Sequence, residues 1–397
     1  MKSLNPFKFG KEVSGSSFYD RKDAAALLRQ KMIDGSSNVV LFAPRRYGKT
    51  SLVQKVLREL ADEDGIRGLC FDLTKTPTVT LFCQSYANAV YAALHGHGDL
   101  TQKFLRALAV WNPSLSVDLA GVVKFKFRAD VNLGVTTESI ADVIDLPERI
   151  AHDLGDVPFV VAFDEFQEVS EISREFPLEK IFRSCIQAHQ NVRYVFLGSK
   201  THLMKRMFGE ATRAFYNSAL PMPLGKPPPE ESRAFLKSRF AEAGLAIADA
   251  EVESVLATSC NVPYYLQELA SGVFEHAVAN GATTVCADDI AYATDEIVAR
   301  NAELYDVRTG TFSTSKFLLV RALAEEPTSV FDEAYRSRHG LSVSSTVHTA
   351  LRELIEAGVI EDGRASTPYT LVDPFFARYL LRSPAFVFSK REVEDGD

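Results

Sequence analysis

The apolar residues in the first half of the chain gather into short runs that are separated by longer amphipathic stretches. Runs of strand length cover residues 39–42, 68–73, 159–163 and 192–197, and a run with two prolines follows at 219–224. Continuous apolar residues of this length indicate strands covered on both faces, as in a parallel sheet, whereas prolines favour an edge strand. Helical periodicity marks residues 18–32, 51–60, 81–94, 100–110, 140–154, 178–189 and 203–208. The pattern predicts an α/β domain built on a parallel sheet.

Residues 121–131 have a different pattern, because lysine or arginine alternates there with apolar residues. Strict alternation predicts an exposed β-excursion from the domain. The alternating lysines and phenylalanines would also suit the stacking of nucleic-acid bases. A half-buried edge strand is the favoured interpretation.

The second half of the chain begins with a change of composition at Gly225-Lys226-Pro227-Pro228-Pro229-Glu230, which predicts a stiff linker. Helical patterns then cover residues 233–242, 251–258, 264–279 and 287–301, followed by shorter ones at 317–323, 330–338 and 344–358. Two expected strands, 359–362 and 369–373, complete the order of a winged helix-turn-helix. The predicted divisions are a lead-in (1–17), a core domain (18–225), a helical lid (226–307), a winged helix domain (308–390) and an acidic tail (391–397).

A phosphate-binding motif follows the first expected strand. The sequence Ala43-Pro44-Arg45-Arg46-Tyr47-Gly48-Lys49-Thr50 fits the pattern G-x-x-x-x-G-K-[ST], with Ala43 in place of the first glycine. Between a strand and a helix, such a loop directs its backbone N–H groups at an anion, whereas a chance Gly-Lys-Thr in a loop would not. Lys49 would reach the β- and γ-phosphates and Thr50 would bind Mg²⁺. Alanine adopts a positive φ less readily than glycine, so Ala43 is a departure that weakens the match.

The motif therefore predicts a nucleotide site. The candidate nucleotide-binding residues of the loop are Pro44, Arg45, Arg46, Tyr47, Gly48, Lys49, Thr50 and Ser51.

Two carboxylates follow the apolar run at 159–163, namely Asp164 and Glu165. Open α/β sheets place their ligands at the carboxyl ends of their strands, where these side chains would lie. Asp164 is expected to hold Mg²⁺ through water, and Glu165 to orient and polarise an attacking water. Ser199 follows the next expected strand, where it would contact the γ-phosphate or the water; the alternative is an ordinary helix cap.

Composition sets limits on the remaining possibilities. The chain has 397 residues, a formal net charge of −8 and 46% hydrophobic residues, as ordinary globular proteins do. The net charge argues against binding nucleic acid by bulk electrostatics but allows a local basic face. Five scattered cysteines are interpreted as buried thiols of a reducing cytoplasm, and no apolar run has the length of a membrane helix. We expect a cytoplasmic protein.

With these motifs in place, the chain resembles the archaeal-type ATPases at the border of the AAA+ and STAND classes. The resemblance rests on Phe18-Tyr19-Asp20-Arg21, the phosphate loop, Ala162-Phe163-Asp164-Glu165-Phe166-Gln167, Gly198-Ser199, Asn261-Val262-Pro263-Tyr264-Tyr265-Leu266 and Asp373-Pro374-Phe375-Phe376. It implies a five-stranded parallel sheet, ATP at its carboxyl edge, a helical lid and a winged helix. It also implies that Tyr19 and Arg21 line the base pocket and that Pro263 lies near the adenine. For Pro263 the alternative is a proline that simply begins a helix.

One departure from the family concerns catalysis. The family often has an arginine just before the last core strand, where this chain reads Tyr216-Asn217-Ser218-Ala219. Such an arginine stabilises the charge of the transition state, so its absence argues against rapid, oligomer-driven hydrolysis. Arg206 and Arg213 are nearby candidates to replace it, although arginines in such a segment are usually only solvated.

These observations predict an ATP-binding switch that hydrolyses ATP slowly, with Mg²⁺ as cofactor and a protein partner reached through the lid and winged helix. Lys49, Glu165 and Ser199 are its expected catalytic residues, and Thr50 and Asp164 its metal ligands. The alternatives are a DNA-associated AAA+ ATPase and a non-catalytic scaffold with structural nucleotide; oligomerisation stays open. In the expected recognition helix, the outward side chains are Ser344, Ser345, His348, Thr349 and Arg352, and the buried stripe is Val347, Ala350, Leu351 and Leu354.

Overall fold

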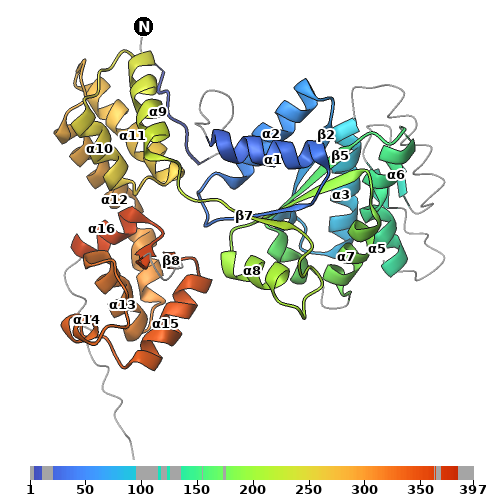
Figure 1. Cartoon of the computed structure of the whole chain (residues 1–397). Helices are drawn as coiled ribbons and strands as arrows, with labels where there is room; N and C mark the ends of the chain where they lie inside the picture. Colours follow the sequence, from blue (N-terminus) through green and yellow to red (C-terminus); the bar gives the residue numbers. More distant parts are fainter. Residues whose placement is uncertain are drawn as a thin grey trace, which may run out of the picture. The chain divides into compact units, whose positions relative to one another are not determined.

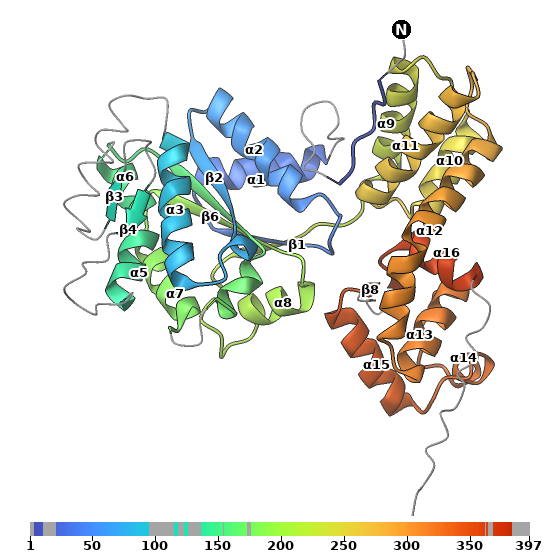
Figure 2. The ribbon, with the colours of Figure 1, turned by 180° about the vertical axis from the view of Figure 1, so that it is seen from behind.

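The computed structural model describes residues 4–10, 21–94, 115–117, 123–125, 136–153, 155–172, 176–361, 363 and 368–382. The chain divides into two compact units, one formed by Gly10–Glu231 and one formed by Met1–Phe9 together with Ser232–Asp397. Figures 1 and 2 show the ribbon from opposite sides. The expected helix at 100–110, Tyr19, most of the 121–131 excursion and the acidic tail lie outside the described residues.

The unit Gly10–Glu231 is built on a five-stranded parallel sheet, as expected. Its strand order is β2-β5-β6-β1-β7. The strands are β1 (Val39–Phe42), β2 (Arg67–Asp72), β5 (Phe159–Asp164), β6 (Val192–Gly198) and β7 (Leu220–Pro223). The proline-containing β7 pairs only with β1, so the prediction of an edge strand is confirmed. Because all the strands run in one direction, the ends of β1, β5 and β6 lie together at one edge of the sheet.

Helices cover both faces of this sheet. They are α1 (Lys22–Asp34), α2 (Lys49–Glu63), α3 (Val79–Leu94), α5 (Thr137–Ile144), α6 (Leu146–Asp153), α7 (Leu178–Ala188) and α8 (Thr201–Gly209). Figures 1 and 2 show α1 and α2 on one face and α3, α5 and α7 on the other. Residues 140–154, expected as one helix, form two helices that meet at Asp145. Pro147 explains the break, since proline has no N–H to donate and clashes with the preceding turn.

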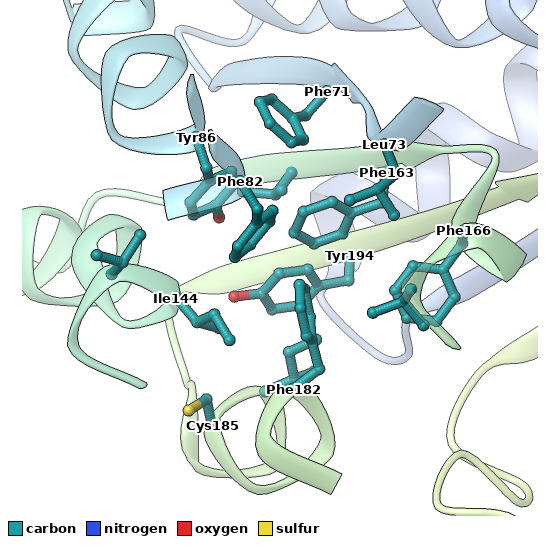
Figure 3. Packing of buried hydrophobic residues seen from close by; sticks show 14 of the residues in the cluster. Phe71, Leu73, Phe82, Tyr86, Ile144, Phe163, Phe166, Phe182, Cys185 and Tyr194 are labelled. Atoms are coloured by element: carbon teal, nitrogen blue, oxygen red, sulfur yellow. The ribbon is translucent and has the colours of Figure 1, made fainter. Parts of the chain in front are cut away.

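An aromatic core fills the space between the sheet and α3, α5 and α7 (Figure 3). The fully buried Phe163 of β5 lies at its centre, with ring centroids 5.5 Å from Tyr86, 5.3 Å from Phe182 and 6.1 Å from Tyr194. Large buried rings of this kind contribute much apolar area and hold their neighbours in fixed orientations. The core therefore holds β5 in place next to its carboxyl end, which carries Asp164 and is followed by Glu165.

A second, two-stranded antiparallel sheet joins β3 (Leu115–Val117) to β4 (Val123–Phe125). The predicted β-excursion is found here in part, since β4 falls within residues 121–131. Its partner β3 has no counterpart among the expected strands, because three residues are too few to show a period.

The other unit is helical and contains a small hairpin before its last helix. Its elements are α9 (Pro229–Glu242), which begins within the preceding unit, then α10 (Asp249–Thr258), α11 (Pro263–Ala279), α12 (Ala287–Gly310), α13 (Thr314–Glu325), α14 (Glu333–Arg338), α15 (Ser344–Glu356), β8 (Ile360–Glu361), β9 (Thr370–Leu371) and α16 (Pro374–Arg382). The expected division at residue 308 falls inside α12, which continues to Gly310 because Tyr305 and Thr309 extend its buried face. Among the described residues, no helix is both long and apolar enough to cross a membrane.

The sequence pattern does not predict the last helix, α16. Asp373 accepts hydrogen bonds from the backbone N–H groups of Phe375 and Phe376 and so caps its start. Phe375 packs against Tyr265 of α11, and Phe376 packs against Tyr305 of α12. The Asp-Pro-Phe-Phe sequence is therefore a helix start that fastens α16 to the preceding helices.

Residues 4–9 belong to this helical unit although they begin the chain. The Asn5 Nδ2 donates to Ser271 Oγ at 2.8 Å and to Glu275 Oε1 at 2.9 Å. Phe7 is buried, with its ring 4.8 Å from that of Phe240. Residues 4–9 of the expected lead-in (1–17) are thus a packed part of the C-terminal unit.

The cysteines correct one expectation. All five lie in the described part of the chain and are free thiols, but only Cys83 and Cys185 are buried. Cys260 and Cys286 are exposed because they lie at the ends of helices. At such positions, apolar neighbours in the sequence do not imply that the side chain is buried.

Candidate nucleotide-binding site

The expected phosphate loop connects β1 to α2. Arg46 and Gly48 have left-handed φ angles of 71° and 80°. An added Cβ at Gly48 would meet open space, so glycine is needed there for its backbone conformation and not for room. Ala43 is buried and is absent from the residues with positive φ. The alanine at the first glycine position therefore causes no backbone strain.

Lys49 begins α2 and turns its side chain back into the loop. Its Nζ donates to the carbonyl oxygen of Ala43 at 2.8 Å and of Pro44 at 3.1 Å. Burial lowers the pKa of the ammonium from 10.5 to about 8, although the charges of Glu165 and Asp164 act in the opposite direction. A buried ammonium whose hydrogen bonds go only to carbonyls suits a phosphate anion, because the anion would supply the missing countercharge.

Thr50 and Asp164 bring two oxygen atoms together beside this lysine. The Thr50 hydroxyl donates to Asp164 Oδ2 at 2.6 Å, and the other carboxylate oxygen accepts from the Glu165 N–H. Burial chiefly raises the pKa of Asp164, and the nearby Glu165 charge adds to this effect. A hydroxyl and a carboxylate are hard oxygen donors, and Mg²⁺ keeps its other positions for water and phosphate. The donor set thus fits Mg²⁺, which Thr50 and Asp164 would hold.

Glu165 is held by a group of donors at the ends of β5 and β6. Its Oε2 accepts from the Ser199 hydroxyl at 2.6 Å, from the Ser199 N–H at 3.1 Å and from the Gln167 amide. Burial by itself would raise the pKa of Glu165, but these hydrogen bonds and the Lys49 charge hold it below its usual value. The carboxylate is therefore ionised at neutral pH, as a group that accepts a proton from water must be.

Of the residues that hold Glu165, Ser199 is assigned from the sequence, whereas Gln167 is not. Glu165 has a left-handed φ of 52°, and the next residue, Phe166, is fully buried with its ring 4.5 Å from Phe196. A Cβ added to Gly198 would lie 2.2 Å from Met204 Cγ and 2.7 Å from Gln167 Oε1, so glycine leaves room for both side chains. The Asp-Glu-Phe-Gln motif could have indicated these two roles, since Phe166 anchors the turn and Gln167 holds the carboxylate of Glu165.

Arg21 lies near the site but is engaged with the main chain. Its guanidinium donates to the Tyr47 carbonyl at 2.7 Å and to the Gly225 carbonyl at 2.8 Å. It thereby joins the phosphate loop to the linker that follows the sheet. The base-pocket role of Arg21 and of Tyr19, which lies outside the described residues, stays a prediction.

Pro263 lies in the other unit, where it occupies the first turn of α11. This is the position of a helix-start proline, and a place near the adenine stays a prediction. Ser51 is buried in α2 beside Thr50.

The two arginines that could replace the missing one differ in their surroundings. Arg213 is paired with Glu179, and its Nε is buried without a hydrogen-bond partner among the described residues. Arg206 is exposed on α8 and forms an i,i+4 pair with Glu210 at 3.0 Å. Neither donates to Glu165, Asp164 or the phosphate loop in this structure.

The chain was compared with known proteins. A family model with the description "Probable winged helix domain" matches residues 303–382. No curated protein matches the chain by sequence. A Walker-type ATPase of Pyrococcus abyssi has a similar structure, with a TM-score of 0.65 and 18% identity over 95% of this chain and 99% of the other. The ORC2 protein of Aeropyrum pernix, solved as ADPNP–ADP complexes, has a TM-score of 0.57 and 14% identity over 96% of each chain.

These likenesses agree with the order of elements described above and confirm the predicted fold class. The chain has the same fold as the Walker-type ATPase of Pyrococcus abyssi, with a five-stranded parallel sheet, an all-helical region and a C-terminal winged helix domain.

Proposed function

We propose that this protein binds ATP with Mg²⁺ and hydrolyses it slowly, as a nucleotide-dependent switch. The observation that carries the proposal is the buried Lys49 ammonium, which lies against loop carbonyls beside the Thr50–Asp164 pair. A phosphate chain is the ligand that would satisfy all three residues together. The nucleotide complexes named for the Aeropyrum relative support the same ligand class.

Each side chain has a role in this proposal. Lys49 binds the β- and γ-phosphates, and Mg²⁺ held by Thr50 and Asp164 neutralises phosphate charge. Glu165 orients the attacking water and accepts its proton, which its ionised state permits. The hydroxyl of Ser199 donates to Glu165 and would sense the γ-phosphate of bound ATP.

The switch would act through the helical lid (226–307) and the winged helix domain (308–390), which follow the ATPase core (18–225). We propose a protein partner for the winged helix, because its expected recognition surface has few available cations. The side chains of Ser344, Ser345, His348, Thr349 and Arg352 are all exposed on α15. Of the neighbouring basic residues, Lys316 is paired with Glu353 and Arg338 with Glu326 at 2.7 Å.

A DNA-associated ATPase is the second candidate, since the exposed serines, threonine and histidine of α15 could contact base edges. A non-catalytic scaffold with structural nucleotide is the third. Oligomerisation would be consistent with any of the three. Detectable phosphate release by the purified protein would exclude the scaffold.

The proposal is tested with Lys49→Ala, compared with Lys55→Ala on the same helix. At ATP–Mg²⁺ concentrations near 100 times Kd, bound nucleotide should stabilise the wild type by about 2.7 kcal/mol. Lys49→Ala should lose this thermal shift and keep its circular dichroism spectrum, whereas Lys55→Ala should retain the shift. If ATP–Mg²⁺ raises the melting temperature of Lys49→Ala as much as that of the wild type, the site is misassigned.

A further inference from the structure

We propose that Arg45 is a catalytic residue that stabilises the transferring phosphoryl group from within the same chain. This inference rests on the proposed ATPase function and concerns how that activity is catalysed. Arg45 would take the place of the arginine that the stretch before β7 lacks, without a contribution from a second molecule.

The backbone places Arg45 next to the carbonyl group that accepts a hydrogen bond from the Lys49 ammonium. The Nζ of Lys49 lies 3.1 Å from the Pro44 carbonyl oxygen, and this carbonyl forms the peptide bond with the Arg45 nitrogen. Standard peptide dimensions therefore bring the Arg45 Cα within about 6 Å of the ammonium. In the proposed function the β- and γ-phosphates would lie at this ammonium, so an arginine side chain that begins so close to it is long enough to reach them.

The charge of Arg45 is available, whereas nearby cations are engaged. Arg45 is exposed and forms no ion pair with the described residues. The engaged cations are Arg21 with the carbonyls of Tyr47 and Gly225, Lys200 with Glu168, Arg206 with Glu210 and Arg213 with Glu179. The charge of Arg45 also contributes to the lowered pKa of Lys49, so both cations act on the same small region.

The Arg45 guanidinium would be a second cation beside Lys49, and it would stabilise charge that develops only during hydrolysis. Hydrolysis forms a bond from the water oxygen to the γ-phosphorus and breaks the bond from that phosphorus to the β–γ bridging oxygen. The bridging oxygen leaves on ADP, and the water proton passes to Glu165 and is released with inorganic phosphate. Negative charge grows on the bridging and γ-oxygens as the bond breaks, and a guanidinium with several fixed donors suits them. Arg45 should therefore affect the rate more than the binding of ATP.

The test measures single-turnover hydrolysis of saturating ATP–Mg²⁺ by the full chain, over a range of protein concentrations. Arg45→Gln should slow hydrolysis about 10²-fold, the scale for removing one donor to developing charge. Arg45→Lys should restore part of the rate, since it keeps the charge without the fork of donors. The affinities for ATP and ADP should change less than tenfold. Arg58→Gln, which removes an exposed arginine of α2, is the matched control and should behave as the wild type.

Three outcomes would overturn the inference. The first is an Arg45→Gln rate within twofold of the wild type, which leaves the proposed ATPase function standing. The second is a rate that rises with protein concentration and collapses in Arg206→Gln, which would assign the arginine to a neighbouring molecule. The third is a wild type that hydrolyses no ATP; the thermal shift lost in Lys49→Ala would then decide separately whether ATP binds.

Discussion

Among single residues, Lys49 shows most directly how the fold sets the chemistry of the site. The residue is 6% exposed, and the neighbouring carboxylates offset only part of the cost of burying its ammonium. Burial of this kind favours the uncharged form of a lysine and is common at functional sites. A phosphate bound beside Lys49 would supply the countercharge that these carboxylates only partly provide.

The pH dependence of stability should reveal this charge. The Lys49 pKa is about 8 in the folded chain and 10.5 in the unfolded chain, so the unfolded state binds more protons between these values. Stability rises with pH wherever the unfolded state binds more protons. Without nucleotide and Mg²⁺, the free energy of unfolding should increase by about 3 kcal/mol from pH 8 to pH 10.5 relative to Lys49→Met. Urea denaturation of both proteins across this range measures the difference; parallel curves would contradict the prediction.

Glu165 is the residue on which hydrolysis should depend most. Glu165→Gln keeps the size of the side chain but cannot accept a proton from water. ATP affinity should be unchanged, and single-turnover hydrolysis should slow by about 10²–10⁴-fold. Glu168→Gln removes the same charge three residues away, where Glu168 is paired with Lys200, and should hydrolyse ATP as the wild type does. Equal rates for both variants would rule out the role of Glu165.

The sequence predicts the helices and strands that have a long apolar run or a definite motif. β5 and β6 are apolar along most of their length, so their place in the sheet and the position of Asp164 follow from the pattern. The short β3 and the start of α16 have no such period. The left-handed turn at Glu165 and the room that Gly198 leaves for Gln167 depend on contacts between separate strands, which no local pattern contains.

The aromatic core beneath β5 allows a matched stability test. Tyr86 and Tyr194 are fully buried and both stack on Phe163, but only Tyr194 has a hydrogen bond, to His189 at 2.6 Å. The Tyr86 hydroxyl has no partner among the described residues. Tyr86→Phe should raise the free energy of unfolding by about 1 kcal/mol, whereas Tyr194→Phe should lower it by about 1–3 kcal/mol. Urea denaturation measures both, and equal signs would contradict the assignment of partners.

The helix α15 carries the prediction about DNA. Its only cation on the exposed face is Arg352, and duplex affinity depends largely on neutralising phosphates. We expect the full chain to bind mixed duplexes in 150 mM salt more weakly than about 1 μM, as non-specific binding does. Fluorescence anisotropy with labelled duplexes measures this. Submicromolar binding that Arg352→Ala weakens would instead favour the DNA-associated candidate.

For the whole molecule, the path of the chain makes its first residues part of its last unit. The chain forms contacts with the helical unit at Asn5 and Phe7, then builds the unit Gly10–Glu231, and returns to the helical unit at Ser232. Two covalent connections therefore join the units.

The N-terminal segment should therefore stabilise a unit that is more than 220 residues away in sequence. Phe7→Ala removes a ring that is 5% exposed and packs against Phe235 and Phe240, which should cost about 3 kcal/mol. Leu4→Ala is the matched control, because Leu4 is 90% exposed and should contribute little. Hydrogen exchange should become faster in α9 and α11 of Phe7→Ala and stay unchanged in β1, β5 and β6. The ATP-dependent thermal shift should persist, since Lys49, Thr50 and Asp164 lie in the other unit. Unchanged exchange in α9 and α11 would show that the segment does not stabilise this unit.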